Sequence, residues 1–293
     1  ELDLRLDGIS SEEEVAERAG VAVAEAQLSA ASIDLDAALT AQITGDAQDA
    51  AMFASAQSDY DQVAAQNAEA TSQAAEDLDV ALDASLITIR AGLQSADQVL
   101  GVDNTILNID IDQYVGVLDQ TTLNDAEDAF EQAAEMRDDA EDDVLALTSS
   151  STEAEVLMAY ASVSTALSFT SNTLLYTSRV LDASVSDSGD FSNADLIAIR
   201  ATIAAERSTV SAEISTLLSA KQAYDSAIRL ADDRQTDAAN ALALTEAQEA
   251  SGEASREAAV AKANASVAVQ TANVAQAQAR LAQVLADPRD IDV

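Results

Sequence analysis

Side chains capable of acid, base or nucleophilic chemistry are few in type, although carboxylates are abundant. The 293-residue chain has 53 acidic and 14 basic residues, but no histidine and no cysteine. Catalysis by serine–histidine or cysteine–histidine pairs, histidine metal sites and zinc–thiolate sites are therefore excluded. Serine–lysine chemistry would need Lys221 or Lys262, the two lysines of the chain. Both fall in strongly helical stretches, which favours a surface role.

Acidic side chains cluster at residues 137–143 (RDDAEDD) and 230–237 (LADDRQTD), where acid–base pairs could form. Their spread around a helix is typical of a solvated face instead. Residues 103–112 (DNTILNIDID) and 186–190 (SDSGD) could offer oxygens to calcium, but neither has EF-hand spacing, which favours turn-forming and capping roles. A glycine-rich phosphate loop is also absent. We therefore predict no catalytic, cofactor-binding or metal-ligating residue, and no enzymatic activity.

The formal net charge of -39 restricts the partners that the chain can bind. Such a surface repels nucleic-acid phosphates and anionic membranes, so neither is an expected partner. The sequence has no apolar run of membrane-spanning length, so we expect no membrane insertion by this segment. An acidic, lysine-poor surface suits a salty or extracytoplasmic setting, although it would also suit any soluble, self-repelling protein.

The composition predicts an all-α fold with long helices. Ala, Leu, Gln and Glu are plentiful, whereas one proline and eight glycines give few helix breaks. The sequence predicts helices over residues 11–100, with an interruption at Gly45, and over 122–147, 152–183 and 192–286, with a weak point at Gly252. The nine aromatic residues lie mainly in the middle of the chain, where they are expected to form a bundle core.

Helix starts are indicated by capping signals. Ser10 or Ser11 precedes three glutamates that favour the positive end of a helix. Capping boxes are predicted for two later helices, one from Thr152 with Glu155 and one from Ser192 with Asp195. Residues 2–6 (LDLRL) alternate in polarity and could form a short strand. Gly101 is a predicted helix stop.

Seven-residue repeats occur near both ends of the chain. In the first segment one column holds Val21, Leu28 and Leu35, and the other holds Ala24, Ala31 and Ala38. In the last segment one column holds Val260, Val267, Val274 and Leu281, and the other holds Ala263, Gln270, Ala277 and Val284. These columns predict a long antiparallel coiled-coil hairpin with an inserted helical bundle. The expected parts are a first arm over 1–74, a bundle over 75–245 and a return arm over 246–293.

The single proline lies close to the end of the sequence. Asp287 is a good N-cap, Pro288 suits a first helical position, and Asp290 lies three residues after the cap. We therefore expect the long helix to stop near Ala286 and another helix to start there. This pattern indicates a segment of a longer protein.

The quoted motifs resemble a known family. An "ELD" start leading into an Ala/Gln heptad arm, the return arm VAQAQARLAQ, the ending PRDIDV and the stretch ADQVLGVDNT at residues 96–105 are similar to the hairpin region of HlyD-like periplasmic adaptor subunits, or membrane-fusion proteins, with long inserts. The chain lacks the family's lipoyl-like, β-barrel and membrane-proximal domains. It also lacks the Arg, Leu and Ser spacing that often marks tips docking on an outer-membrane channel.

The resemblance implies a non-catalytic stalk in an envelope-spanning efflux or secretion adaptor. The expected location is periplasmic or otherwise extracytoplasmic, in the cell envelope. The expected partners are a membrane transporter and envelope proteins, contacted through domains outside this chain, and the full-length protein is expected to form a homo-oligomer. A second interpretation from another class is a coiled-coil surface or fibre-forming structural protein.

The charge predicts that salt stabilises the fold. Helical circular dichroism melts should shift to higher temperature between ~20 mM and ~1 M NaCl, because salt screens repulsion among the many carboxylates. A flat or falling trend would contradict this expectation.

Overall fold

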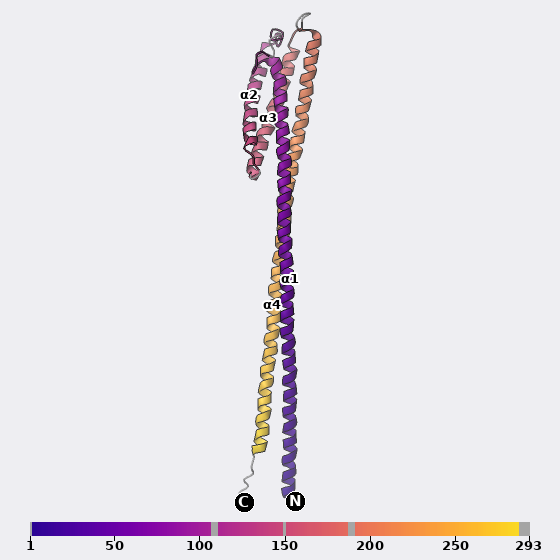
Figure 1. The fold of residues 1–293 in the computed structure, drawn as a ribbon, viewed down its shortest axis with the longest axis vertical. Helices are drawn as coiled ribbons and strands as arrows, with labels where there is room; N and C mark the ends of the chain where they lie inside the picture. The colour runs from indigo at the N-terminus through magenta and orange to yellow at the C-terminus, as the bar shows by residue number, and fades with distance from the viewer. Residues whose placement is uncertain (1, 107–110, 149–150, 187–190, 287–293) are drawn as a thin grey trace. The chain divides into compact units, whose positions relative to one another are not determined.

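The computed structural model describes residues 2–106, 111–148, 151–186 and 191–286, with side chains from residue 11 onward. This part of the chain contains four helices and no strand (Figure 1): α1, Leu2–Leu100; α2, Gln120–Leu145; α3, Glu153–Asp182; and α4, Asn193–Ala286. The predicted all-α hairpin with an inserted bundle is confirmed. The helix predicted to start at Asp287 lies outside the described residues.

Three local predictions along α1 are wrong. Residues 2–6 are helical rather than a strand, the helix runs through Ser10 and Ser11 instead of starting there, and it continues through Gly45. A glycine inside a helix costs about 1 kcal/mol relative to alanine, which contacts with another helix can offset. Gly252 likewise lies inside an unbroken α4.

The capping predictions for the later helices are confirmed. Thr152 Oγ1 accepts from the Glu155 N–H, and the Glu155 carboxylate accepts from the Thr152 N–H at 2.6 Å. Ser192 and Asp195 make the same exchange before α4. The N–H of Thr152 lowers the pKa of Glu155, and the hydroxyl of Ser192 lowers that of Asp195. The sequence did not reveal the N-cap of α2, Asp119, which accepts from two backbone N–H groups.

Helix α1 ends just before Gly101, the predicted helix stop. Gly101 has φ +67° and donates its N–H to the carbonyl of Asp97 at 2.8 Å, a conformation that glycine adopts without steric cost. The buried Asp97 side chain accepts from the N–H of Asp103 at 2.9 Å. The chain therefore leaves the helix in a defined direction.

The fold divides into two compact units. We call residues Glu1–Val63 with Thr236–Val293 the arm unit, and residues Ala64–Gln235 the bundle unit. From the sequence, the boundaries between the arms and the bundle were predicted near residues 74 and 245. Helices α1 and α4 contribute to both units, whereas α2 and α3 lie wholly in the bundle unit.

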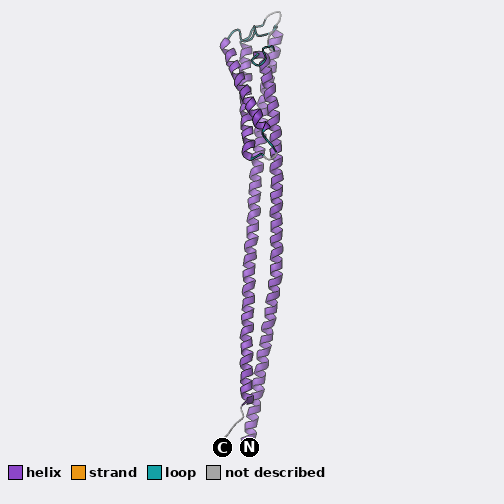
Figure 2. Cartoon of the chain, turned by 60° about the vertical axis from the view of Figure 1, so that its left-hand side comes forward, coloured by secondary structure: helices purple, strands orange, loops and turns teal. Residues whose placement is uncertain are grey.

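In the arm unit, α1 and α4 lie side by side (Figure 1; Figure 2). The predicted columns are the less exposed positions in both arms. Ala24 and Ala31 are buried, at 7% and 5% exposure, while the larger members of the columns are partly covered. Small side chains at these positions let the two helices approach closely, which explains how a seam with so few large residues can form.

In the bundle unit, α1 and α4 present different repeats to a common core. Buried residues of α4 recur every seven positions: Leu196, Ile203, Val210, Leu217 and Tyr224. Buried residues of α1 recur every eleven positions, at Asn67, Leu78, Ile89 and Leu100, with further columns beside them. An eleven-residue repeat has about 3.67 residues per turn, so its stripe drifts around the helix in the opposite sense to that of the heptad repeat on α4.

Helices α2 and α3 form an antiparallel pair within the same unit, and their residues complete its core. Phe130 of α2 is almost fully buried, and Thr173 of α3 donates to the carbonyl of Ala129 at 2.9 Å. A β-carbon at Gly92 of α1 would lie 2.8 Å from Thr170 Cγ2. The missing side chain at Gly92 therefore allows α1 to approach α3 closely.

Polar groups tie α1 to α4 inside the bundle unit. The buried Asn67 donates to the carbonyl of Ala231 at 2.8 Å, and Ser85 donates to the Glu213 carboxylate at 2.9 Å. A buried amide pairs well in one register only, so such bonds select a register at some cost in stability. Arg200 similarly donates to the carbonyl of Leu181 at 2.6 Å, near the end of α3.

Disulfide crosslinking tests the antiparallel register of the arms. A β-carbon at Gly45 would lie against Arg256, and three heptads away from this contact in opposite directions lie Ala24 and Ala277. Because the chain has no native cysteine, an A24C/A277C variant should form one disulfide within a monomer under mild oxidation.

The matched control is A24C/A263C, which shifts the second cysteine by two heptads, about 21 Å along the helix. It should stay reduced or link only between chains. Efficient intramolecular linkage of the control, or purely intermolecular linkage of A24C/A277C, would contradict this register.

Candidate functional site

The acidic clusters noted in the sequence lie on surfaces rather than in a common site. In α2, Arg137 pairs with Asp138 at 2.7 Å and with Glu141 at 3.8 Å. In residues 230–237, the charged side chains are all exposed. No group of three or more acidic residues is placed to hold a metal ion within the described part of the chain. The interpretation as a solvated face therefore agrees with the exposure of residues 230–237. In residues 137–143 it holds only in part, because Glu141 accepts from Arg90 of α1 and Asp143 accepts from Ser162 of α3.

The other sequence candidates occupy local structural roles where they are described. Lys221 pairs with Asp225 one turn further along α4, and Lys262 is exposed. In segment 103–112, Asn104 accepts from the N–H of Ile106, which forms a turn. The remainder of that segment and most of 186–190 lie outside the described residues.

A charged cluster crosses the seam of the arm unit. Arg256 of α4 donates from Nη2 to Asp49 Oδ2 at 2.6 Å and from Nε to Asp46 Oδ1 at 3.0 Å, and both carboxylates belong to α1. The side chains of Arg256 and Asp49 are only 19% and 13% exposed, whereas that of Asp46 is 49% exposed. This guanidinium thus bridges two carboxylates in a partly desolvated position.

The cluster coincides with an irregularity in the seam. Covered positions alternate by three and four residues along both arms, except for two successive steps of four. On α1 these steps run from Gly45 through Asp49 to Phe53, and on α4 from Gly252 through Arg256 to Val260. Such four-residue insertions, called stutters, locally unwind a coiled coil. Asp49 and Arg256 each stand at the centre of a stutter and contact one another.

Two glycines make room for the charged side chains. Side chains on a helix lean over the preceding turn, so Asp49 leans over Gly45 and Arg256 over Gly252. A β-carbon at Gly45 would lie 2.6 Å from Arg256 Cδ. A β-carbon at Gly252 would lie 2.9 Å from Arg256 Nη1 and 3.0 Å from Asp49 Oδ2. Alanine at either position would therefore displace the guanidinium.

The seam columns predicted the arms, but the sequence analysis missed this cluster. The signal was present as a glycine followed four residues later by a charged residue, at Gly45 and Asp49 in one arm and at Gly252 and Arg256 in the other. From the sequence alone, both glycines are predicted to be weak points in their helices. The structure shows that they are sites of close cross-helix contact.

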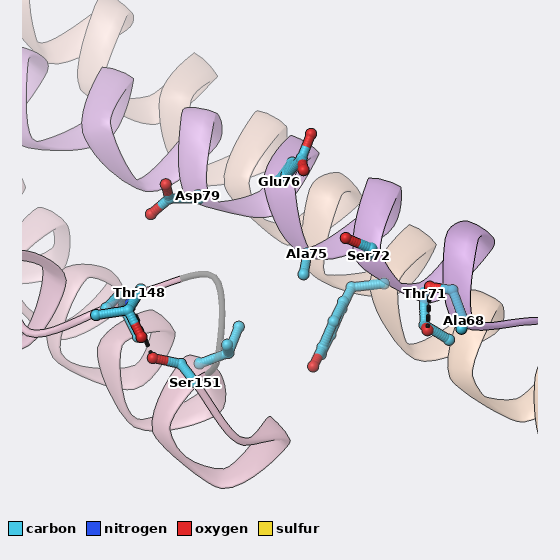
Figure 3. Close-up of a pocket in the computed structure, with 11 residues that line it drawn as sticks. Ala68, Thr71, Ser72, Ala75, Glu76, Asp79, Thr148 and Ser151 are labelled. Atoms are coloured by element: carbon cyan, nitrogen blue, oxygen red, sulfur yellow. Dashed lines mark hydrogen bonds between the residues drawn. The ribbon is translucent and has the colours of Figure 1, made fainter.

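The second feature is a cavity of about 540 Å³ in the bundle unit (Figure 3). Its described lining includes Ala75 and Asp79 of α1, and Thr148 and Ser151, which lie between α2 and α3. Tyr224 of α4 also lines it. Figure 3 shows Asp79 projecting from α1 on the side where Thr148 and Ser151 lie. The Ser151 hydroxyl accepts from the N–H of Thr148 at 2.9 Å.

The surroundings of the cavity favour positive charge. Burial, then the charge of Asp83, raises the pKa of Asp79. Burial, then Glu153 and Asp225, raises the pKa of Tyr224. The described lining contains no basic side chain. Because the folded pKa of Asp79 lies above its ordinary value, its ionisation opposes folding, and this contribution grows as pH rises through the carboxyl range.

Comparisons with known proteins found no matching family model, no matching curated protein and no matching solved structure. None of the helices in the described residues has the length and apolar character needed to cross a membrane.

Replacing Arg256 tests whether the cluster holds the arms together. An R256M variant leaves the 13% exposed Asp49 side chain without its cation, so we expect a lower unfolding free energy and a lower urea midpoint than for the control. The matched control is R18M, which removes an exposed pair between Arg18 and Glu14 on one helix and should cost less than about 0.5 kcal/mol.

The measurement is urea unfolding followed by helical circular dichroism. Equal midpoints for R256M and R18M would show that the cross-seam cluster contributes no more than a surface pair.

Proposed function

We propose that the chain is a non-catalytic structural stalk, part of an adaptor that links a membrane transporter to the rest of a cell envelope. The observation that carries the proposal is the arm unit, in which two helices far apart in sequence pair along a seam with a specific charged contact. A helix pair of this kind would act mechanically, by holding the parts attached to it in position. It needs no reactive group, and the covered positions are occupied mainly by small and aliphatic residues.

The surface chemistry supports an extracytoplasmic, envelope location for such a stalk. The net charge of -39 keeps stalk flanks apart at low salt and excludes nucleic acid as a partner. The resemblance of ADQVLGVDNT and of the arm sequences to HlyD-like adaptors supports the same interpretation. Under this proposal, domains outside this chain contact the transporter and set the homo-oligomer.

A specific observation favours a second candidate, a fibre-forming surface protein. The first arm exposes large apolar side chains at Val15, Val23, Ile33 and Ile43, each at 58% or more. Isolated exposed apolar residues are ordinary, but several along one arm suit lateral contact with further chains. The same residues would serve neighbouring stalks in an adaptor, so the two candidates differ in their partner.

Site-specific photocrosslinking in the cells that make the protein separates the candidates. A photoreactive residue at exposed Ile43 or Ile87 should yield crosslinks in the envelope fraction to other envelope components, including a membrane transporter subunit. The control position is Ala31, which is 5% exposed and should crosslink only within the hairpin.

Crosslinks restricted to copies of the same chain in a cell-surface filament fraction would establish the fibre instead. Recovery of the chain in the cytoplasm with no envelope crosslink would contradict both candidates.

A further inference from the structure

In the arm unit, α1 carries a second heptad seam on the face turned away from α4. Its members lie two and five residues after those of the covered column that holds Val21 and Leu28, and all of them are exposed. They are Ala16, Ala19, Val23, Ala26, Ala30, Ile33, Ala37, Thr40, Thr44 and Ala47. Thr40 and Thr44 donate their hydroxyls to carbonyls of α1 at 2.8 and 2.9 Å. This face, which we call the α1 outer seam, is therefore apolar and uncharged.

On α4, the corresponding outer face consists of alanine alone. Nine exposed alanines alternate by three and four residues along it: Ala258, Ala261, Ala265, Ala268, Ala272, Ala275, Ala279, Ala282 and Ala286. We call this face the α4 outer seam. Because α1 and α4 are antiparallel and Arg256 contacts Asp46 and Asp49, both outer seams follow the same stretch of the arm unit, about 45 Å long.

The two outer seams lie on opposite sides of the hairpin. Each is almost opposite the covered seam of its own helix. The small remaining rotation has opposite senses along the two chains, and because the helices are antiparallel it has the same sense in space. The outer seams therefore point in opposite directions. A second copy lying alongside in the same orientation would bring its α4 outer seam against the α1 outer seam of the first.

Shape and charge favour this pairing over contact between two like faces. Val23 and Ile33 project from the α1 outer seam at 58% and 65% exposure, and a surface of alanines leaves room for such side chains. Residues 11–48 of α1 carry eight acidic side chains and one arginine, whereas residues 258–286 of α4 carry Lys262 and Arg280 and no acidic side chain. Contact between two α1 faces would bring carboxylates together, but contact between α1 and α4 brings opposite charges together.

We infer that copies of this chain pack side by side in the same orientation, with the α1 outer seam of one copy against the α4 outer seam of the next. Each such contact leaves one outer seam free on either side, so repeated contacts build a row, or a ring if the row curves and closes. The net charge of -39 opposes this packing at low salt, and screening by salt permits it. The inference concerns contacts between copies, so it stands or fails whether or not a membrane transporter is the partner.

Disulfide trapping between two single-cysteine variants tests which faces meet. The chain has no native cysteine, so A26C marks the α1 outer seam and A272C, carrying a mass tag, marks the α4 outer seam at nearly the same level. When the two are mixed at about 1 M NaCl and mildly oxidised, the A26C–A272C heterodimer should exceed either homodimer at least about fivefold. The matched control replaces A272C with A258C, two heptads or about 21 Å away on the same seam, and should link to A26C much less.

Sedimentation velocity of charge variants tests the same contact without a crosslink. The unmodified chain should self-associate reversibly at about 1 M NaCl. A268E places a carboxylate in the α4 outer seam and should weaken association at least about tenfold, while the helical melt stays close to that of the unmodified chain. The matched control is S266E, the same added charge at an exposed residue outside the outer seam, which should change association less than about twofold.

Four results would overturn the inference. One is a chain that stays monomeric and forms no heterodimer at about 300 µM protein. The second is a predominance of A26C or A272C homodimers, which would show contact between like faces. The third is equal trapping of A26C by A272C and A258C, which would indicate random collision. The fourth is equal weakening of association by A268E and S266E, which would indicate general charge repulsion.

Discussion

One charged contact joins the two arms at the point where the spacing of covered residues is irregular in both of them. Arg256 lies between Asp46 and Asp49, and glycines on both helices leave space for it. Most of the other covered positions in the arms hold small or aliphatic residues, although Gln42, Phe53, Tyr60, Glu249 and Gln270 also occur among them. The small and aliphatic residues that repeat every heptad provide contact area but distinguish only weakly between registers.

A slip of one heptad shows how the contact selects the register. In place of Asp46 and Asp49, Arg256 would face Leu39 and Gln42 in one direction, or Phe53 and Ala56 in the other. Neither set offers a carboxylate, so a poorly solvated guanidinium would remain without an anion. The cluster therefore discriminates strongly against slipped pairings, even where its net contribution to stability is modest. The buried Asn67 is placed to act in the same way within the bundle unit.

The inserted bundle obtains its specificity from a different source. Its core contains leucines, isoleucine, valines and phenylalanines, whose shapes differ enough to pack in one arrangement. Where the packing is incomplete, beside Tyr224 and Asp79, the cavity combines apolar walls with negative charge.

The sequence predicted the all-α class, three helix starts or stops and both seam columns, because these depend on local spacing and capping chemistry. Thr152, Ser192 and Gly101 behave as their local sequence indicates. Prediction from the sequence failed where a contact between residues far apart in the chain outweighs local helix propensity. Gly45 was expected to interrupt α1, yet it lies in continuous helix because its missing side chain admits Arg256, which is more than two hundred residues away. The cavity could not be predicted, since its walls come from four separate segments.

The central claim is that Gly45 serves the cross-helix contact rather than helix flexibility. The most direct measurement compares the urea unfolding of G45A with that of G20A. A β-carbon at Gly20 meets no atom within 4 Å, so G20A should gain up to about 1 kcal/mol from improved helix propensity. G45A receives the same gain in propensity, but its β-carbon displaces Arg256, so we predict a net loss of stability. Equal stabilisation of both variants would contradict the account.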